Sequence, residues 1–297
     1  MILITGLTGR SGSAFYDVLC RERYSEKIRV VVRETTKRDQ FKNTPLNLEF
    51  AVGDIRDGAF LDRAMEGCDT VFHIANKEII RPLAEAVKRA PFVRNVILVS
   101  STIVYSQHYP RLHLREDEAY CRQLFEKQGI KYLFIRPTMI FGLPNDRNIS
   151  QFIRWFLKYP VFPIVKHGRA SIQPVSRLDV AEAYYSLLQA FPNLEKTEYV
   201  VSGEVSMSLL ELFRTLCRLA GRNVYFVNVP FPLAKAAVNI VYFLSGKRCD
   251  YKEKLERLAE DRAYSHDDIT RELGYQPGRF EDRVAPLIEQ IKAEKNS

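Results

Sequence analysis

Three glycines near the start of the chain have the spacing of a phosphate-binding turn. Gly6, Gly9 and Gly12 directly follow the apolar run at residues 2–5 and open a segment with helical spacing. Gly6 permits a tight turn, Gly9 lets the backbone approach a bound anion, and Gly12 lets the helix pack on the strand. Free N–H groups at a helix N-terminus attract negative charge. The pattern predicts a pyrophosphate site, with a glycine turn that binds nothing as the alternative. The polar residues of this predicted site are Thr8, Arg10 and Ser11.

The elements that must position this turn follow along the first half of the chain. Short β-rich runs alternate with segments of helical periodicity, which favours βαβ units and a parallel sheet. Near-continuous apolar runs such as residues 96–99 are typical of strands covered on both faces. The sequence therefore predicts an α/β fold with a doubly wound parallel sheet. The expected strands are residues 2–5, 28–33, 46–51, 70–75, 96–100 and 132–136.

The pattern changes after residue 137, where helical segments dominate and only residues 198–201 and 224–227 look extended. We therefore expect a nucleotide-binding domain over residues 1–144 and a smaller, mainly helical substrate domain over residues 145–297, with parts of the chain crossing between them. The helices expected in this half are residues 149–158, 178–190, 207–220, 233–244, 251–260, 265–273 and 280–292.

Composition and charge narrow the class of protein. The chain has 297 residues and a formal net charge of +8, but the basic residues form no long run, so nucleic-acid binding is not expected. The five cysteines form no CxxC pair, and the N-terminus lacks a secretory signal, which favours a cytoplasmic protein without a metal site. Residues 230–244 are nearly apolar but too short to span a bilayer. They predict a buried or partner-facing helix, with interfacial membrane contact as the alternative.

Several motifs, taken in order, resemble those of the extended and atypical short-chain dehydrogenase/reductase superfamily of NAD(P)-dependent epimerases and dehydratases. The glycine turn is followed by Gly-Asp-Ile-Arg-Asp at residues 53–57. Residues 69–75, 99–105 and 136–142 resemble the fourth, fifth and sixth strands of that family, and residues 173–183 and 272–277 resemble parts of its C-terminal domain. The resemblance covers nearly the whole chain and implies a Rossmann fold.

The resemblance also implies which residues bind the cofactor. Asp54 corresponds to the residue that reaches the adenine edge, with Ile55 beside the ring. The ends of the fourth and sixth strands add Ala75, Asn76 and Pro137.

Arg33 bears on the choice of nucleotide because it lies 21 residues after Gly12, where the family carries an acid or a basic substitute. A guanidinium suits a 2′-phosphate, which favours NADP(H). Glu34 would instead suit the ribose diol of NAD(H), and a solvated basic turn is the third interpretation.

The family's catalytic Tyr-x-x-x-Lys pair is missing. None of the 15 tyrosines has a lysine four residues later, and the pair should fall at Leu114 and Glu118. Ser101 or Thr102 can take the role of the family's substrate-binding serine, with strand-end capping as the alternative. Tyr105 lies on the segment expected to face the nicotinamide, as do His108 and His113, although a loop histidine is more often a surface residue.

The family pattern disfavours a sugar-nucleotide substrate. Ile172 stands where many epimerases carry a pyrophosphate-binding arginine, and Arg169 or Arg177 would have to compensate. Sugar 4,6-dehydratases carry Asp and Glu where this chain has Thr102 and Ile103, which disfavours that reaction. Polar residues for a small-molecule substrate are predicted at the domain junction: Asn145, Arg147 and Asn148.

Two functions of different classes remain open at this point. The first is an NAD(P)(H)-binding oxidoreductase or epimerase-like enzyme acting on a small carbonyl or sugar-type metabolite. The second is a non-catalytic NADP(H)-sensing regulator or scaffold protein, which the missing pair favours. Members of the superfamily often form homodimers through two helices, which correspond here to residues 82–90 and 116–128.

Overall fold

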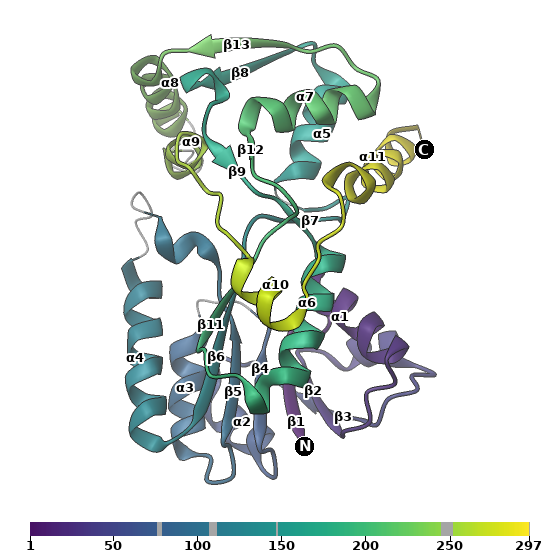
Figure 1. The fold of residues 1–297 in the computed structure, drawn as a ribbon, viewed down its shortest axis with the longest axis vertical. Coiled ribbons are helices and arrows are strands. Elements are labelled where there is room, and N and C mark those ends of the chain that lie inside the picture. The colour runs from purple at the N-terminus through teal and green to yellow at the C-terminus, as the bar shows by residue number, and fades with distance from the viewer. Residues whose placement is uncertain (76–78, 107–111, 147, 245–251, 297) are drawn as a thin grey trace.

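A seven-stranded parallel sheet forms the centre of the larger body of the molecule (Figure 1). The structure is a computed structural model and describes residues 1–75, 79–106, 112–146, 148–244 and 252–296. The strand order is β11-β6-β5-β4-β1-β2-β3, so the predicted doubly wound α/β fold is confirmed. The strands are β1 (Ile2–Thr5), β2 (Ile28–Val32), β3 (Leu48–Val52), β4 (Thr70–His73), β5 (Asn95–Val99), β6 (Lys131–Pro137) and β11 (Glu198–Val201).

Helices cover both faces of the sheet because side chains alternate along each buried strand. Ile2 and Ile4 pack into one apolar cluster, whereas Leu3 between them packs into the other. The first face is covered by α1 (Arg10–Arg21) and α6 (Arg177–Ala190). The opposite face is covered by α2 (Gly58–Met65), α3 (Ile80–Arg89) and α4 (Leu112–Gln128).

The order of the sheet reverses between β1 and β4, since β2 and β3 lie on one side of β1 and β5 and β6 on the other. Ligands of open α/β sheets bind in the crevice at the carboxyl ends of the strands at such a point. The glycine turn follows β1 directly, and Ala75 follows β4 closely. The topology therefore brings the predicted pyrophosphate site to the expected edge.

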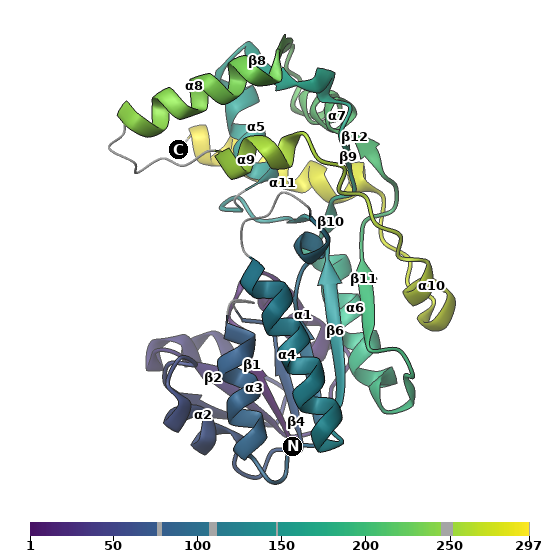
Figure 2. The same cartoon turned by 90° about the vertical axis from the view of Figure 1, so that its left-hand side faces the viewer.

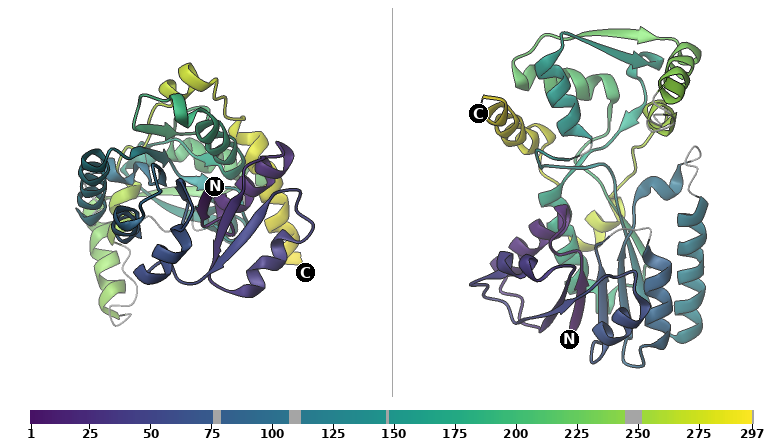
Figure 3. Two further views of the ribbon diagram at one scale, coloured as in Figure 1. Left: turned by 90° about the horizontal axis from the view of Figure 1, so that it is seen from below. Right: turned by 180° about the vertical axis from the view of Figure 1, so that it is seen from behind.

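A smaller lobe lies beyond this edge, joined to the sheet body through a narrow waist (Figures 2 and 3). Its core is a separate apolar cluster that includes Phe156, Phe213 and Ile288. Its helices and longer strands are α5 (Ile149–Lys158), β8 (Val161–Val165), α7 (Leu209–Ala220), β13 (Tyr225–Val229), α8 (Phe231–Leu244), α9 (Lys252–Leu258) and α11 (Phe280–Asn296).

Short elements complete the chain. Three small strand pairings lie outside the main sheet. Two of them join two-residue strands: β7 (Ile140–Phe141) with β10 (Val175–Ser176), and β9 (Ser171–Ile172) with β12 (Met207–Ser208). The third joins β8 and β13 in parallel. The remaining helical segments are η1 (Thr35–Phe41), η3 (Thr102–Tyr105), η4 (Lys166–Gly168), η5 (Phe191–Asn193) and α10 (Asp267–Leu273).

The expected helices of the second half all form, but the chain crosses between the lobe and the sheet body more than once. β11 extends the sheet beside β6, α6 packs against α1, and α10 packs against β11 (Figure 1). Within the described residues, no helix is both long and apolar enough to cross a membrane.

Candidate active site

The glycine turn is built so closely that side chains would not fit at two of its positions. Gly6 has a φ of +80°, and a Cβ on it would lie 2.6 Å from the backbone nitrogen of Ala75. A Cβ on Gly12 would lie 2.1 Å from the carbonyl oxygen of Gly6. The turn therefore holds β1, β4 and α1 in near contact, as a pyrophosphate-binding turn requires.

The N-terminus of α1 is suited to an anion. Gly9 is its N-cap, makes no side-chain cap, and is followed by a first turn without an acidic residue. The helix dipole and the first N–H groups are therefore not neutralised by the helix itself. Arg10 adds a guanidinium at this end, and its Nη2 donates to the carbonyl of Asn145 at 3.1 Å. Thr8 and Ser11 are half-buried in the same turn.

Residues predicted for the adenosine end lie at the carboxyl ends of β2 and β3, which are neighbours in the sheet. Arg33 follows β2 and is exposed, while Asp54 and Ile55 come shortly after β3. The Asp54 side chain accepts a hydrogen bond from the Arg56 N–H at 2.9 Å and so shapes the turn itself. Asp57 caps α2 by accepting from the Ala59 N–H.

Residues predicted beside the rest of the cofactor follow the neighbouring strands. Ala75 contacts the glycine turn, and Pro137 ends β6 with its carbonyl 3.5 Å from Thr102 Oγ1. Asn76 lies outside the described residues, as do Arg147 and His108.

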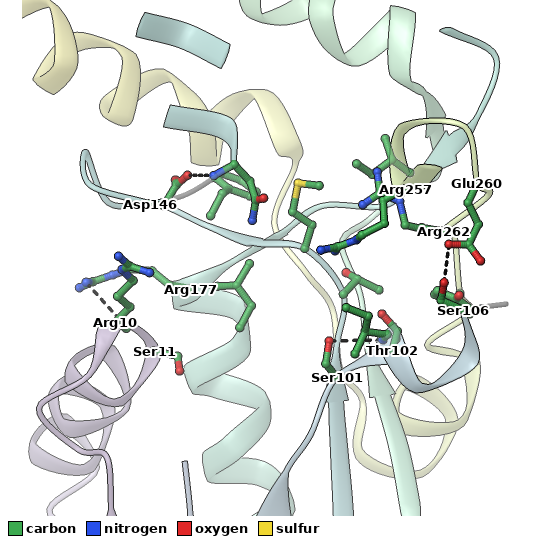
Figure 4. Close-up of a pocket in the computed structure, with 18 of the residues that line it drawn as sticks. Arg10, Ser11, Ser101, Thr102, Ser106, Asp146, Arg177, Arg257, Glu260 and Arg262 are labelled. Carbon is green, nitrogen blue, oxygen red and sulfur yellow. Dashed lines mark hydrogen bonds between the residues drawn. The ribbon is translucent and has the colours of Figure 1, made fainter. Parts of the chain in front are cut away.

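A cavity of about 360 Å³ lies between the sheet body and the lobe (Figure 4). Arg10 and Ser11 line it on one side, and Ser101 and Thr102 line it at the end of β5. The cavity thus connects the glycine turn to the predicted substrate-binding hydroxyls. One extended ligand, or two smaller ones, would fill it.

Hydroxyl groups line the part of the cavity beside β5. Ser101 Oγ accepts from the Ile103 N–H at 3.4 Å and caps η3, so the capping interpretation is realised while the side chain also lines the cavity. Thr102 is buried and donates to Pro137. Ser106 Oγ donates to Glu260 Oε2 at 2.6 Å, which ties the end of η3 to the lobe.

Two arginines of the lobe form the wall opposite Arg10 and Arg177 (Figure 4). Arg257 is on α9, and Arg262 follows five residues later. Burial and the nearby positive charge of Arg257 lower the pKa of Arg262 to about 10. Arg262 Nε is buried, with no hydrogen-bond acceptor in the described part of the chain. Such a group stabilises an anionic ligand, because the ligand would supply the missing acceptor and the opposite charge.

Predicted substrate residues lie at the other side of the cavity. Asn148 lines it and begins α5, whereas Asn145 is exposed and contributes its carbonyl to Arg10. Asp146 fixes this segment by accepting from the Asn148 and Ser150 N–H groups at 2.9 and 3.0 Å. Arg177, which the sequence offered as a replacement for the family's arginine, lines the cavity and donates to Ser13 Oγ at 3.4 Å. Arg169 is exposed and lies outside the lining.

Tyr105 was expected to face the nicotinamide, but the structure directs its side chain away from the cavity lining. Its hydroxyl donates to Glu198 Oε1 at 3.2 Å, its ring packs against the Tyr264 ring at a tilt of 44°, and it is not part of the cavity lining. Burial and the charge of Glu198 raise the pKa of Tyr105. His113 does not face the cavity either, because its side chain is 87% exposed and pairs with Glu116 on α4.

Glu118 occupies the position expected for the family's lysine and belongs to a buried ionic network. Ser100 Oγ donates to Glu118 Oε1, and Arg136 Nη2 donates to Glu118 Oε2 at 2.5 Å. Arg136 Nη1 lies 2.7 Å from Glu198 Oε2, which also pairs with Arg122. Burial alone would lower the pKa of Arg136. The interactions with Glu118, Tyr105 and Glu198 outweigh burial, so the pKa of Arg136 is raised. The Glu118 carboxylate ties α4 to β5 and β6 and is not part of the cavity lining.

Some residues of the site were not anticipated from the sequence: Thr138, Met139, Arg257, Glu260, Arg262 and Tyr264. The last four lie more than 150 residues from Ser101 in the chain, in a charged segment that looks like an ordinary surface helix. Two arginines five residues apart were the available signal, but only the fold shows that they face Ser101. Among the described residues, no group of His, Cys, Asp and Glu could hold a metal ion.

Comparison with known proteins agrees with this architecture. The chain is 26% identical over 249 residues to a (4-alkanoyl-5-oxo-2,5-dihydrofuran-3-yl)methyl phosphate reductase of Streptomyces griseus subsp. griseus, covering 82% of each chain. It is 25% identical over 243 residues to the NAD(P)H azoreductase of Xenophilus azovorans, covering 80% of each. The crystal structure of DesIV, a dTDP-glucose 4,6-dehydratase from Streptomyces venezuelae, superposes with a TM-score of 0.74 at 19% identity, covering 99% of this chain and 98% of that one.

These similarities confirm the resemblance to NAD(P)-dependent epimerase and dehydratase-type Rossmann proteins that the motifs predicted. At 19% identity the dehydratase shows a shared fold and nothing about the reaction. The family model that matches spans residues 1–262, which includes the glycine turn, the ends of β5 and β6, and both arginines of the lobe. The chain therefore belongs to the NmrA-like family.

Proposed function

We propose that this protein is an NAD(P)H-dependent reductase of a small carbonyl compound held in the cavity between the sheet body and the lobe. The observation that carries the proposal is the continuity of the cavity, which joins Arg10 and Ser11 of the glycine turn to Ser101 and Thr102 after β5. The two relatives at 25–26% identity are named as the reductase of a methyl phosphate ester and as an NAD(P)H azoreductase, so both names support a reduction.

The chain offers a fitting site for the dinucleotide. Gly6 and Gly12 let the turn after β1 approach Ala75 and α1 closely, because a Cβ at either position would meet backbone atoms, and the N-terminus of α1 carries no acidic residue in its first turn. Arg33 stands where it would meet a 2′-phosphate, which favours NADP(H) over NAD(H). When bound, the reduced nicotinamide supplies a hydride. Asp54, Ile55, Ala75, Asn76 and Pro137 are proposed to line the rest of this site.

The hydroxyl of Ser101 is proposed to donate to the carbonyl oxygen of the substrate, because Ser101 Oγ accepts from the Ile103 N–H, whereas the Thr102 hydroxyl beside it donates to Pro137. In place of the missing Tyr-x-x-x-Lys pair, we propose Tyr264 as the proton donor, because it lines the cavity whereas Tyr105 is engaged with Glu198. Burial and the charge of Glu260 raise the pKa of Tyr264, so its hydroxyl keeps its proton at neutral pH. Asn148, with Asn145 and Arg147 of the same segment, is proposed to contact the substrate.

We propose further that the substrate carries an anionic group, which Arg257 and Arg262 bind. Arg262 is desolvated, repelled by Arg257 and short of an acceptor, and a phosphate would relieve all three costs. The Streptomyces relative is named for a methyl phosphate substrate, which agrees with this assignment.

The test is the initial rate of NADPH oxidation with the dihydrofuranone methyl phosphate and with its dephosphorylated alcohol. We expect Arg262→Gln to raise KM for the phosphate by about ten- to a hundredfold while kcat changes little, because the contact is the same in ground and transition states. Arg169→Gln is the matched control, since Arg169 is exposed and outside the cavity. Equal KM values for wild type and Arg262→Gln would show that the two arginines do not bind the substrate.

A nucleotide-sensing regulator is the second candidate, and one observation favours it. Glu118 stands at the position of the family's lysine and is sequestered by Arg136 and Ser100, away from the cavity. If this candidate holds, NADP(H) binds to the wild-type protein but no compound of a carbonyl and sugar collection consumes it.

Cellular context and assembly stay proposals. A cytoplasmic location is favoured by the unpaired cysteines Cys20, Cys68, Cys121 and Cys217 of the described chain. A homodimer through α3 and α4 is proposed by family resemblance alone.

A further inference from the structure

The outermost edge of the lobe exposes an unusually apolar surface, formed by the β8–β13 ribbon, the end of α5 and the start of α8 (Figures 1 and 2). We call it the outer face. Tyr225, Leu233 and Val227 are 74%, 62% and 51% exposed. The exposed apolar residues of the outer face are Trp155, Tyr159, Val161, Tyr225, Val227 and Leu233.

The β8–β13 ribbon exposes this face as a consequence of its register. Phe226 pairs with Phe162, and both rings turn inward onto Phe213, with centroid distances of 6.0 and 5.1 Å. Alternation then directs the neighbouring pair, Tyr225 and Val161, outward. The ribbon is therefore apolar on both sides, although only its inner side is covered.

Two aromatic side chains extend the ribbon. Trp155 and Tyr159 lie 4.8 Å apart between ring centroids, and the Trp155 indole N–H donates to the Val161 carbonyl at 3.1 Å. The Trp155 N–H is thereby satisfied, and both side chains remain exposed, Trp155 by 42% and Tyr159 by 40%. Tryptophan and tyrosine with this arrangement are enriched at membrane–water interfaces.

The segments that include the outer face carry basic residues and no acidic ones. Residues 148–172 and 212–244 contain no Asp or Glu, whereas each contains four Lys or Arg. Lys158 Nζ lies 5.1 Å from the Tyr159 ring centroid and forms no ion pair with an acid among the described residues. Three of the other basic residues, Arg154, Arg218 and Lys235, pair with Glu294, Glu281 and Glu256 of neighbouring helices.

We propose that the outer face docks this protein on the surface of an anionic phospholipid bilayer. Apolar and aromatic side chains would enter the headgroup boundary, and the surrounding lysines and arginines would attract the lipid charge. No described helix is long and apolar enough to span, so the contact lies at the surface. A second copy of the chain fits less well as the partner. A two-fold contact would place the basic surface around Lys158 against the same basic surface of the other copy.

Vesicle sedimentation tests the proposal on the intact chain, with phosphatidylcholine vesicles and with vesicles of equal parts phosphatidylcholine and phosphatidylglycerol. We expect binding to the anionic vesicles only. Tyr225→Ser combined with Val227→Ser should lower the partition coefficient about tenfold by removing inserted apolar area. Lys158→Glu should lower it at least about fivefold.

Controls come from the sheet body. Phe92→Ser alters a residue that is 65% exposed, and Lys127→Glu reverses an exposed charge, so neither should change vesicle binding. NADPH affinity should be unchanged in all variants, which separates this proposal from the reductase proposal.

Absence of binding to anionic vesicles, or equal binding to neutral and anionic vesicles, would overturn the proposal. So would a dimer in sedimentation velocity that Tyr225→Ser with Val227→Ser dissociates, since the face would then belong to a second copy.

Discussion

Arg33 decides the choice of nucleotide in this account, and its substitution gives a direct prediction. Arg33→Ala should weaken NADPH binding about ten- to a hundredfold, or about 1.5–3 kcal/mol, because a charge-assisted contact to the 2′-phosphate is lost. NADH binding should not change. Calorimetric titration of both nucleotides measures this, and equal affinities for NADPH and NADH in the wild type would refute it.

Gly12 leaves no room for a side chain, which predicts the effect of a substitution there. A Cβ at this position would lie 2.1 Å from the Gly6 carbonyl oxygen, so Gly12→Ala must move the turn that faces the pyrophosphate. We expect a loss of nucleotide affinity together with a lower Tm. Gly58→Ala is the control, because its Cβ would only come 3.5 Å from the Arg89 side chain. Both variants are compared by thermal unfolding with and without NADPH.

Tyr264 gives a prediction about pH. Its pKa is raised by burial and by Glu260, so the hydroxyl remains protonated across the neutral range and can donate. The rate of reduction should be nearly constant from about pH 7 to pH 9 and fall only as the pH nears the raised pKa, above about 10. Tyr264→Phe should lower kcat by about a hundredfold or more. A rate governed by a group that titrates near neutrality would assign the proton to a histidine instead.

At the scale of elements, a buried ionic network joins β5, α4 and β6. Arg136 and Glu118 have side chains only 4% and 6% exposed, so removing one leaves the other charge buried. Glu118→Gln should therefore lower the free energy of unfolding by about 3–5 kcal/mol. Urea denaturation measures the change.

A surface pair is the control for this network. Arg21 and Glu182 form two contacts at 2.6 and 2.7 Å between α1 and α6, but both are exposed. Glu182→Gln should cost no more than about 1 kcal/mol. Equal losses for Glu118→Gln and Glu182→Gln would show that burial does not set the strength of the network.

Glu198, on β11, makes the network depend on pH in a defined direction. Burial raises its pKa, but Arg136 and Arg122 outweigh burial and lower it. A lowered pKa contributes stability above the ordinary glutamate pKa and loses it as the pH falls through the folded value. Wild type should therefore exceed Glu198→Gln in stability at neutral pH, and the difference should shrink below about pH 4. A difference that stays constant with pH would contradict this.

For the whole molecule, local patterns predicted the elements well because periodicity and glycine spacing are local signals. The six central strands and the helices of the second half form where they were expected, as with α5. The sequence did not reveal that β11 joins the sheet beside β6, since pairing across 60 residues leaves no local trace. The division at residues 144 and 145 stays a prediction, because α6 and α10 return to the sheet body.

The residues of the candidate site could likewise be predicted only where the signal is local in the sequence. The glycine turn was predictable because turn, strand and helix are consecutive, whereas Arg257 and Arg262 reach the cavity only through the packing of the lobe. Tyr105 illustrates the limit, since its position in the sequence suggested the cavity and the structure directs it to Glu198. Side-chain direction at the end of a strand depends on tertiary partners that the sequence does not specify.

Transfer of deuterium from NADPH deuterated at the nicotinamide C4 tests the central claim most directly. The phosphate-bearing carbonyl substrates are incubated with the protein, and the products are weighed by mass spectrometry. We expect one deuterium in the product with the wild-type protein, and a rate reduced about a hundredfold or more by Tyr264→Phe. NADPH that binds but transfers no deuterium to any of these compounds would contradict the reductase and favour the sensor.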